Sequence, residues 1–491
     1  MNKDRTASSR KAFDPAKLQA LLEHIGHLLP DEQERQAFYR SAHTPPPASL
    51  RLNTLQSQSQ VLLAHLRQSG EGVPWCEEAF VLPASEKGLG QMLEHAMGAY
   101  YIQAKAPMLA VSVLAPQPGE RVLDLCAAPG GKTTQIAAQM QNSGLLLANE
   151  IQSKRMPALV GNLERCGVTN YILSQAPGAM LARYFHNFFD RILVDAPCSG
   201  DGIVRKDQNM LKYWSPQDAQ RLAQQQIGLL RAAYHMLRPG GTLVYSTCSL
   251  SLEENEEVLL GLLRRYGQEV EIHPIESVEN LPLPAEIAAQ FPPEFSRCVR
   301  IWPHHYDTEG AFVTHLSKRA PTTSNHPEGD AADWDIDPGL DPEVTKARRA
   351  IEEIWRCTLP SSPDQIFSLS KRHLCLQPAL GPAIRAHLPY FVRSGMRVAR
   401  RHKGYNYLTQ QTVALWGHLM QGPSVELNRA QLEDLFQGRP MILERSTDIK
   451  GEVLCRFGPW TLCRAMVREE GRILEGMLPR TFFRTQLDTL I

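Results

Sequence analysis

Several features that would assign the chain to a familiar class are missing from its sequence. No apolar run approaches the ~18 residues that a membrane-spanning helix requires, so such a span is not expected. The ten cysteines include no Cys-x-x-Cys pair and no cysteine–histidine cluster, so neither a disulfide framework nor a zinc site is expected. The opening residues, MNKDRTASSRKAF, have no apolar stretch behind their basic side chains, unlike a secretory signal. We therefore expect a cytoplasmic protein without a metal centre.

The composition is otherwise that of an ordinary globular protein. The 491 residues are 43% hydrophobic and 21% charged, and their number suits roughly two to four domains. The net charge is zero, but residues 346–491 hold 22 Lys and Arg against 13 Asp and Glu, while residues 1–345 hold 30 against 39. The C-terminal part is therefore the basic part of the chain.

Residues 381–410 concentrate this positive charge. Six basic side chains occur there without an acidic one, and aromatic side chains such as Tyr405 and Tyr407 lie between them. Such a mixture is typical of surfaces that contact the phosphates and bases of RNA. The RNA-binding candidates of the segment are Arg397, Arg400, Arg401 and Lys403. The alternative is a solvated cationic surface.

The order of apolar and polar stretches predicts four regions. Residues 1–100 mix helices (Pro15–Leu29 and Asp31–Ala42) with short strands and form a small N-terminal domain. Residues 101–320 alternate strand-like and helical runs, which is typical of an α/β fold with a parallel sheet. Residues 321–345 hold seven acidic residues, four prolines and no basic residue, and are expected to be a linker. Residues 346–491 combine helices, the basic segment and a strand-rich end.

The central region contains a regular series of strand candidates. These are Arg121–Cys126, Leu145–Glu150, Tyr171–Gln175, Arg191–Asp195, Thr242–Ser246 and Ala311–Leu316. The longest helical run between them, Pro216–Leu237, stops at Arg238-Pro239-Gly240-Gly241. Side chains that follow these strands are the candidates for a shared site.

A glycine-rich turn follows the first of these strands. Residues 124–133 read DLCAAPGGKT, and small residues there let a ligand approach backbone N–H groups at the start of a helix. A phosphate-binding loop would need glycine where Cys126 stands, and the Gly-x-Gly-x-x-Gly of a dinucleotide fold is missing. Glu150, at the end of the next strand, is placed to accept both hydroxyls of a ribose. Turn and carboxylate together favour an adenosine-type cofactor.

Three long motifs carry a resemblance to a known family. DLCAAPGGKT, DAPCSGDGIVRKD (195–207) and YSTCSLSLEENE (245–256) resemble, in order and spacing, the NOL1/NOP2/Sun family of RNA cytosine-C5 methyltransferases. RLNTL (51–55) and RIWPHHYDTEGAFV (300–313) extend the resemblance over most of residues 45–320. The length, the acidic linker and the basic C-terminal extension are most similar to the bacterial RsmF branch, which modifies a cytosine of 16S ribosomal RNA.

The resemblance implies a Rossmann-like, seven-stranded α/β methyltransferase fold that uses S-adenosylmethionine as the methyl donor. It implies RNA as the partner, most specifically 16S rRNA of the small ribosomal subunit, gripped by a C-terminal region with a PUA-like end. The turn would lie against the cofactor, and Glu150 would hold its ribose. The implied cofactor-binding residues are Cys126, Ala127, Ala128, Pro129, Gly130, Gly131, Lys132, Glu150 and Asp195.

Two cysteines provide the chemistry that such a reaction needs. Cytosine C5 is a poor nucleophile, and a thiolate that adds to C6 activates it toward a methyl donor. Cys198 and Cys248 each follow a strand candidate, so both thiols are expected to open toward the cofactor crevice. Spacing does not decide which one attacks. DNA cytosine methyltransferases use the thiol of a Pro-Cys motif, which would nominate Cys198, whereas the resemblance to the RNA family assigns attack to Cys248 and release of the adduct to Cys198.

Charged residues near the two thiols are further candidates. Asp195 can accept a hydrogen bond from the cytosine amine or, when protonated, donate one to N3; its alternative role is to cap the following turn. Arg205 and Lys206 are expected to contact RNA phosphates, unless their run is a solvated loop. The acidic residues after Cys248 are expected to begin a helix, where early carboxylates are favourable. These are Glu253, Glu254, Glu256 and Glu257.

One position departs from the family pattern. The family has an acid after the third strand, where it receives the adenine amine of the cofactor, and this sequence has Pro177. A proline side chain accepts no hydrogen bond, so either a neighbour such as Gln175 compensates or the cofactor binds more weakly.

Three other functions fit parts of the sequence. A non-catalytic ribosome-assembly factor could keep the fold as an RNA-binding scaffold, although the retained Cys198, Cys248, Asp195 and Glu150 speak against decay. A nicotinamide-dependent oxidoreductase lacks its glycine pattern. Within the family, a transfer-RNA cytosine-C5 methyltransferase is the alternative.

Overall fold

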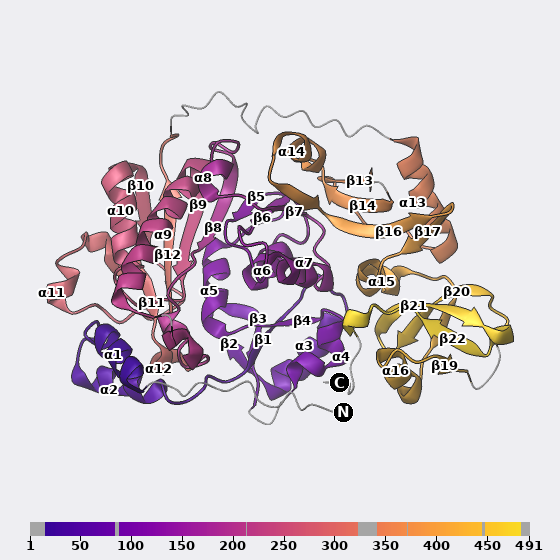
Figure 1. Ribbon diagram of the computed structural model, residues 1–491, viewed down its shortest axis with the longest axis horizontal. Helices are drawn as coiled ribbons and strands as arrows, with labels where there is room; N and C mark the ends of the chain where they lie inside the picture. The colour runs from indigo at the N-terminus through magenta and orange to yellow at the C-terminus, as the bar shows by residue number, and fades with distance from the viewer. Residues whose placement is uncertain are drawn as a thin grey trace, which may run out of the picture.

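A mainly parallel sheet with helices on both faces forms the centre of the molecule in the computed structural model (Figure 1). The structure describes residues 15–83, 88–212, 214–322, 341–370, 372–443 and 447–482. Most of the predicted linker, residues 323–340, lies outside the described residues. Within the described residues, no helix has the length and apolar character needed to cross a membrane.

The seven strands expected of a methyltransferase fold are present in one sheet. Five neighbours run parallel, and two further strands complete one edge, each paired antiparallel with the strand before it. In spatial order they are β7 (Tyr171–Ser174), β6 (Leu145–Asn149), β5 (Arg121–Asp124), β8 (Phe189–Asp195), β9 (Leu237–Thr247), β12 (Ala311–Lys318) and β10 (Val270–His273). The predicted fold class is confirmed. Five of the six predicted strands of the central region begin within two residues of an observed start, whereas β9 begins at Leu237, five residues before the predicted Thr242.

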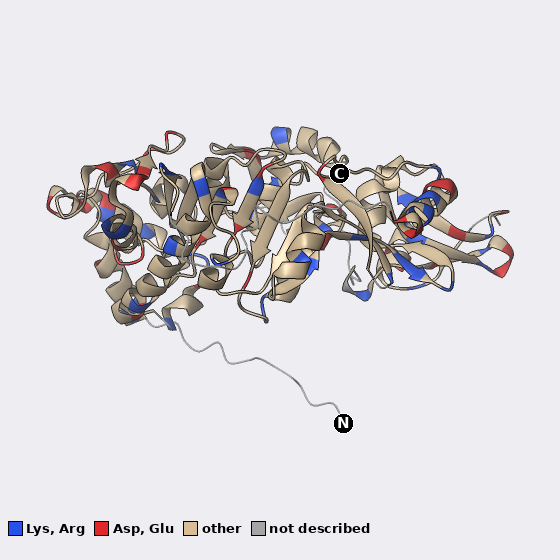
Figure 2. Cartoon of the chain, turned by 90° about the horizontal axis from the view of Figure 1, so that it is seen from above, with Lys and Arg blue, Asp and Glu red and all other residues tan. Residues whose placement is uncertain are grey.

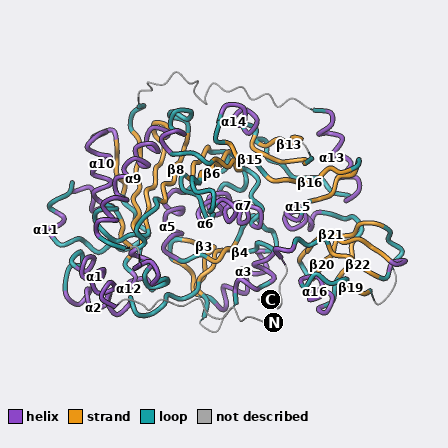
Figure 3. The backbone as a smooth tube through the Cα atoms, viewed as in Figure 1, coloured by secondary structure: helices purple, strands orange, loops and turns teal. Residues whose placement is uncertain are grey.

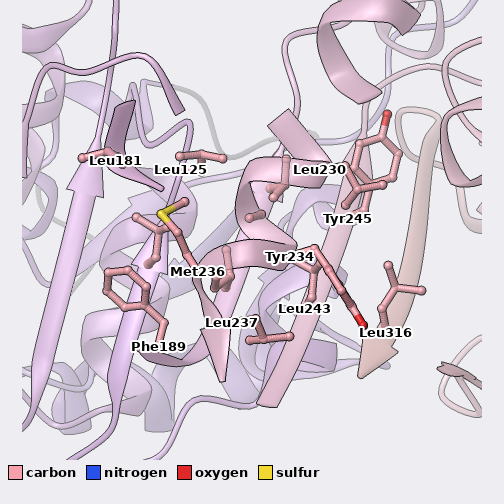
Figure 4. Packing of buried hydrophobic residues seen from close by; sticks show 14 of the residues in the cluster. Leu125, Leu181, Phe189, Leu230, Tyr234, Met236, Leu237, Leu243, Tyr245 and Leu316 are labelled. Carbon is pink, nitrogen blue, oxygen red and sulfur yellow. The ribbon is translucent and has the colours of Figure 1, made fainter. Parts of the chain in front are cut away.

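The central strands are buried on both faces, which explains their continuous apolar sequences. Leu123, Ile192 and Leu243 belong to the core on the side of α9, and their neighbours Val122 and Leu193 belong to the core on the opposite side. Figure 4 shows the first of these cores. The helices that cover the two faces are α5 (Lys105–Leu114), α6 (Gly131–Gln139), α7 (Met156–Arg165), α8 (Gly178–Leu181), α9 (Pro216–Met236) and α10 (Glu256–Tyr266).

The N-terminal region consists of a helical hairpin and a small sheet. The hairpin, α1 (Pro15–Gly26) and α2 (Glu32–Ser41), packs beside α12 (Pro303–Tyr306) of the central region (Figure 1). The small sheet has the order β2–β3–β1–β4. The strands of this sheet are β1 (Ser49–Leu52), β2 (Glu71–Val73), β3 (Cys76–Val81) and β4 (Tyr100–Ile102), and the helices between them are α3 (Ser59–Ser69) and α4 (Leu93–Ala96).

Two antiparallel-rich sheets make up most of the C-terminal region (Figure 3). The first has the order β13–β14–β16–β17 and the second β18–β20–β21–β22–β19. The strands are β13 (Gln365–Ser370), β14 (His373–Pro378), β16 (Met396–His402), β17 (Tyr405–Leu408), β18 (Ser424–Glu426), β19 (Met441–Ile442), β20 (Gly451–Phe457), β21 (Trp460–Arg468) and β22 (Ile473–Gly476). The helices are α13 (Pro342–Trp355), α14 (Gly381–His387), α15 (Gln410–Trp416) and α16 (Arg429–Phe436). A PUA-like end stays a prediction.

The C-terminal region also reaches into the central sheet. Strand β15 (Phe391–Ser394) pairs antiparallel with β7, and β11 (Val299–Ile301) pairs with β12 near the other edge, so the sheet has nine strands. α11 (Ala285–Ala288) lies outside this sheet. The strand β15 comes from the basic segment, for which the sequence predicted only a surface.

Candidate active site

The two predicted thiols meet above the sheet. Cys198 and Cys248 follow β8 and β9, which are parallel neighbours with Asp195 opposite Ser246, so their carboxyl ends lie side by side. The two Sγ atoms are 2.6 Å apart, and the backbone N–H of Cys248 donates to Cys198 Sγ at 3.2 Å. The prediction that these two cysteines, out of ten, share one site agrees with this placement.

The surroundings of Cys198 favour its neutral thiol form. The hydrogen bond with Cys248, and then burial, raise the pKa of Cys198 well above its ordinary value. Cys198 is therefore held as a neutral thiol, which can donate a proton. A protonated donor next to a second sulfur is the arrangement that a nucleophile and a releasing group require.

A cavity of about 290 Å³ opens onto both sulfur atoms. Its wall includes Cys126 and Lys132 from the glycine-rich turn, together with Asp195. A larger cavity of about 1080 Å³ lies between the N-terminal sheet and the C-terminal region, and no predicted site residue lines it. The smaller cavity is the one in which chemistry-bearing side chains converge.

An ion pair closes one side of this cavity. Lys132 Nζ lies 2.8 Å from Asp195 Oδ2, and Ser246 Oγ donates to Asp195 Oδ1 at 2.9 Å. Burial disfavours the charged lysine, but the neighbouring Asp195 outweighs burial and raises the pKa of Lys132. The pair places a cationic donor and an anionic acceptor beside the thiols.

The glycine-rich turn has the predicted strand–turn–helix shape. It follows β5 and leads into α6, with Gly130 in the left-handed region at φ 110°. Thr133 Oγ1 donates to Asp124 Oδ2 at 2.7 Å, while Asp124 Oδ1 has no partner among the described residues. Burial raises the pKa of Asp124 to about 7. The turn presents small residues along the crevice, as expected of a surface that lies against a cofactor.

Glu150, at the end of β6, has a carboxylate oxygen that is ion-paired but receives no hydrogen bond from the described residues. Its side chain is 3% exposed, and Oε1 accepts the backbone N–H of Gln152 at 2.8 Å. Oε2 receives no hydrogen bond from the described residues, although Arg155 Nη1 lies 3.2 Å away without hydrogen-bond geometry. A buried carboxylate oxygen without a hydrogen bond is costly, and a ribose hydroxyl would satisfy it. Arg155, which also donates to the carbonyl of Ala128 in the turn, was missed by sequence reasoning.

A buried carboxylate network holds the two cysteine loops together. Glu254 accepts the backbone N–H of Ser199 at 2.9 Å and Gln226 Nε2 at 2.8 Å. Asp201 accepts the backbone N–H of Leu250 at 2.6 Å and Ser249 Oγ at 2.8 Å. The expectation that Glu253 and Glu254 begin a helix is wrong, because α10 starts at Glu256 and Glu254 turns inward to the Cys198 loop. Sequence reasoning missed this network because its partners come from separate motifs.

The prediction for Arg205 is wrong. The residue is 8% exposed, and all of its guanidinium nitrogens donate inside the protein, to Thr44, Pro303, Asp307 and Thr308. The guanidinium therefore fastens three chain segments and offers no donor to phosphate. Lys206 is exposed beside it and pairs with Glu309 at 2.8 Å.

The basic candidates of the C-terminal region lie on the hairpin of β16 and β17. Arg397, Arg400 and Lys403 are exposed, and Tyr405 is 67% exposed beside them. Arg401 is half-buried and pairs with Glu343 of α13 at 3.1 Å. Figure 2 shows acidic segments close to basic ones in this part of the chain. Three of the four predicted residues are therefore available to a polyanion.

One group of side chains outside the crevice has metal-binding chemistry. Glu34 Oε2 accepts from His304 Nε2 at 2.8 Å and from His305 Nε2 at 2.7 Å. These are hydrogen-bond distances, and the contacts fasten the N-terminal hairpin to α12. The prediction of no metal centre stays a prediction.

Known proteins match the chain over nearly its whole length. The family model described as 16S rRNA methyltransferase RsmB/F matches residues 111–317, and that for the N-terminal domain of 16S rRNA methyltransferase RsmF matches residues 19–105. Ribosomal RNA small subunit methyltransferase F of Aeromonas salmonicida is 35% identical over 474 residues, 94% of this chain and 96% of that protein. The protein of the same name from Erwinia tasmaniensis is 34% identical and covers 91% and 92%. The chain belongs to the RsmB/F family.

Membership of the RsmB/F family confirms the resemblance read from the motifs, including the RsmF branch, and makes the chain an RNA methyltransferase. A solved structure described as a methyltransferase homolog protein from Pyrococcus horikoshii is 30% identical, with a TM-score of 0.53 over 62% of this chain and 99% of that chain. NSun6 from the same organism, solved with SFG, is 21% identical with a TM-score of 0.53 over 64% of this chain and supports the fold.

Proposed function

We propose that this RNA methyltransferase transfers a methyl group from S-adenosylmethionine to C5 of a cytosine in 16S ribosomal RNA through a covalent cysteine adduct. The observation that carries the proposal is the pair of thiols at one cavity, beside Lys132 and Asp195. The names of the relatives support ribosomal RNA of the small subunit as the substrate. Such a substrate would place the reaction in the cytoplasm.

The cofactor site would be the crevice from the turn to Glu150. When bound there, S-adenosylmethionine supplies an electrophilic methyl group. Glu150 Oε2 would accept the ribose hydroxyls, because it is a buried acceptor without a hydrogen bond. The residues from Cys126 to Lys132 would lie against the rest of the molecule, and Lys132 would keep Asp195 oriented.

The thiols would divide the chemistry on the base. Cys248 Sγ, as thiolate, adds to C6 of the cytosine, and its electron pair makes C5 nucleophilic toward the methyl group. Asp195 holds the N3 and N4 edge of the ring. Solvent water would take the C5 proton, the electron pair of the C5–H bond would re-form the C5–C6 double bond, and the Cys248–C6 bond would break with its electron pair on the Cys248 sulfur. Cys198, held protonated, supplies the proton for the departing Cys248 sulfur and so releases the product.

RNA binding would be shared among the regions predicted from the sequence. The domain at 1–100 and the region 346–491 would flank the methyltransferase domain at 101–320, with 321–345 as the linker. Lys206 near the cavity and Arg397, Arg400 and Lys403 on the β16–β17 hairpin would contact phosphates, since all are exposed cations.

Bisulfite sequencing of ribosomal and transfer RNA from cells that lack the protein tests the proposal. We expect one unconverted cytosine of 16S rRNA to become convertible, and a plasmid copy of the gene to restore it. A copy with Cys248→Ala should not restore it. A lost transfer-RNA site would overturn the substrate assignment, and unchanged cytosines in both RNAs would overturn the reaction.

A further inference from the structure

The order of strands fixes where the base of the cofactor must lie. The thiols stand at the ends of β8 and β9, and Glu150 stands at the end of β6. The transferable methyl group has to face the thiols, and a ribose bound to Glu150 then lies between the methyl group and the base. The adenine of an S-adenosyl cofactor must therefore extend over the end of β7, on the far side of Glu150 from the thiols.

The end of β7 presents one polar side chain beside an apolar one. Gln175 directly follows β7, and its Nε2 donates to the carbonyl of Ile151 at 3.3 Å. Ile151 follows Glu150 and is 55% exposed, unusual for a large apolar residue beside a buried strand. Because the amide N–H of Gln175 faces Ile151, Oε1 points away from it, and the contact with Ile151 is the one side-chain hydrogen bond that Gln175 makes with the described residues.

We propose that Gln175 is a specificity-determining residue of the cofactor site, whose Oε1 accepts the exocyclic amine of adenine. Ile151 provides the apolar contact for the ring. The inference rests on the proposed use of S-adenosylmethionine. It accounts for Pro177, which follows two residues later and has no side-chain acceptor: in an extended chain, positions 175 and 177 face the same side, so Gln175 serves the surface that Pro177 cannot.

The C-terminal region holds this glutamine in place. The backbone N–H of Gln175 donates to the carbonyl of Tyr390 at 3.0 Å, immediately before β15. Strand β15 pairs Phe391 with Ser174, and Arg393 pairs with Glu164 of α7 at 2.6 Å. The base end of the crevice is thus completed by a segment more than two hundred residues away in the sequence. Because the backbone of Gln175 is held in place, its neutral side-chain amide can accept a hydrogen bond from adenine in a defined geometry.

The proposed hydrogen bond between Gln175 and the adenine amine can be tested by measuring the binding of two ligands by calorimetry. S-adenosylhomocysteine carries the 6-amino group, and its purine-riboside analogue has hydrogen in that position. We expect the full-length protein to bind S-adenosylhomocysteine about 5- to 10-fold more tightly than the analogue, the size of one net hydrogen bond. In Gln175→Ala this preference should disappear, through weaker binding of S-adenosylhomocysteine and nearly unchanged binding of the analogue. Gln175→Glu, which keeps an acceptor, should retain the preference.

Two controls separate the contact from general damage. Gln290→Ala changes an exposed glutamine outside the crevice and should leave both affinities as they are. Thermal unfolding shows whether Gln175→Ala remains folded. Equal loss of both ligands in Gln175→Ala, or an undiminished preference, overturns the role of Gln175 but leaves the proposed function standing. Failure of the unaltered protein to bind either ligand overturns the proposed cofactor, and this inference with it.

Discussion

The two ends of the proposed catalytic and cofactor site are built from different parts of the chain. At the thiol end, Cys198, Cys248 and the ion pair of Lys132 with Asp195 all come from the three motifs of the central region. At the base end, Gln175 is held by Tyr390 and by strand β15 of the C-terminal region. The reacting groups are thus fixed locally, and the binding end depends on a long-range contact. Substitutions at the first end should act on turnover, and those at the second on affinity.

We expect the largest effects from substitution of the two thiols, and opposite effects on the covalent complex with RNA. Cys248→Ala removes the nucleophile, and we expect methylation of 16S rRNA to fall by on the order of 10⁴-fold or more, with no covalent RNA complex. Cys198→Ala leaves the nucleophile and removes the proton donor, so the enzyme should accumulate bound to RNA. Denaturing gel electrophoresis of protein with labelled RNA separates the two results. Cys357→Ala, a half-buried cysteine far along the sequence, serves as the control. A trapped complex in Cys248→Ala instead would exchange the two assignments.

Lys132→Met tests whether the ion pair belongs to the thiol end. The change leaves Asp195 without the cation 2.8 Å away, so its orientation toward the base is lost. We expect turnover to fall by about 10²-fold. Single-turnover methylation with saturating RNA and cofactor measures the effect, and Lys154→Met, an exposed lysine after β6, is the matched control. If turnover stayed unchanged and cofactor binding became weaker, Lys132 would act in cofactor binding and not in the chemical step.

The thiol end could be predicted from the sequence because the ends of the apolar runs indicate where the strands end. Cys198, Cys248 and Glu150 each follow an apolar run, and the carboxyl ends of neighbouring parallel strands must meet at one edge. The fold class followed from the same runs. The order of strands and helices was enough to place these side chains at one edge of the sheet, whereas the separate roles of the two thiols came from the resemblance of the motifs to a known family.

The contacts that sequence reasoning missed join distant segments. Arg205 sits in a charged run that looks like a solvated loop, yet its acceptors come from Thr44 and from residues 303–308. Strand β15 is only four residues long and lies in a basic segment, so no apolar alternation marks it. Glu254 stands two residues before the start of α10, and only the fold reveals that it faces Ser199. Such long-range polar contacts leave no periodic signal.

Asp201→Asn should change how the free energy of unfolding depends on pH, because Asp201 belongs to the buried carboxylate network at the thiol end. Burial, and then the neighbouring Glu254, raise the pKa of Asp201 to about 7. The folded protein therefore keeps a proton that the unfolded chain releases at lower pH, so this group's contribution to stability falls as pH rises from about 4 to 7. The asparagine variant lacks this titration and should gain about 1–4 kcal/mol relative to the unaltered protein over that range. Urea unfolding at several pH values measures it, and a constant difference between the two proteins would contradict it.

We expect the smallest effects for two arginine substitutions, one at the buried Arg205 and one at the exposed Arg400. Arg205→Ala leaves the carbonyls of Thr44 and Thr308 without their donor and removes one donor from the carbonyl of Pro303, so we expect a loss of about 1–3 kcal/mol in the free energy of unfolding. Its RNA affinity should keep the same dependence on salt concentration. Arg400→Ala should leave stability unchanged within about 0.5 kcal/mol, because the side chain is exposed, and should lower the salt slope of RNA binding by about 1. Filter binding at several salt concentrations and urea unfolding of both variants decide the matter. If Arg205→Ala changed the salt slope while Arg400→Ala did not, the RNA would contact the central region at Arg205 and bypass the β16–β17 hairpin.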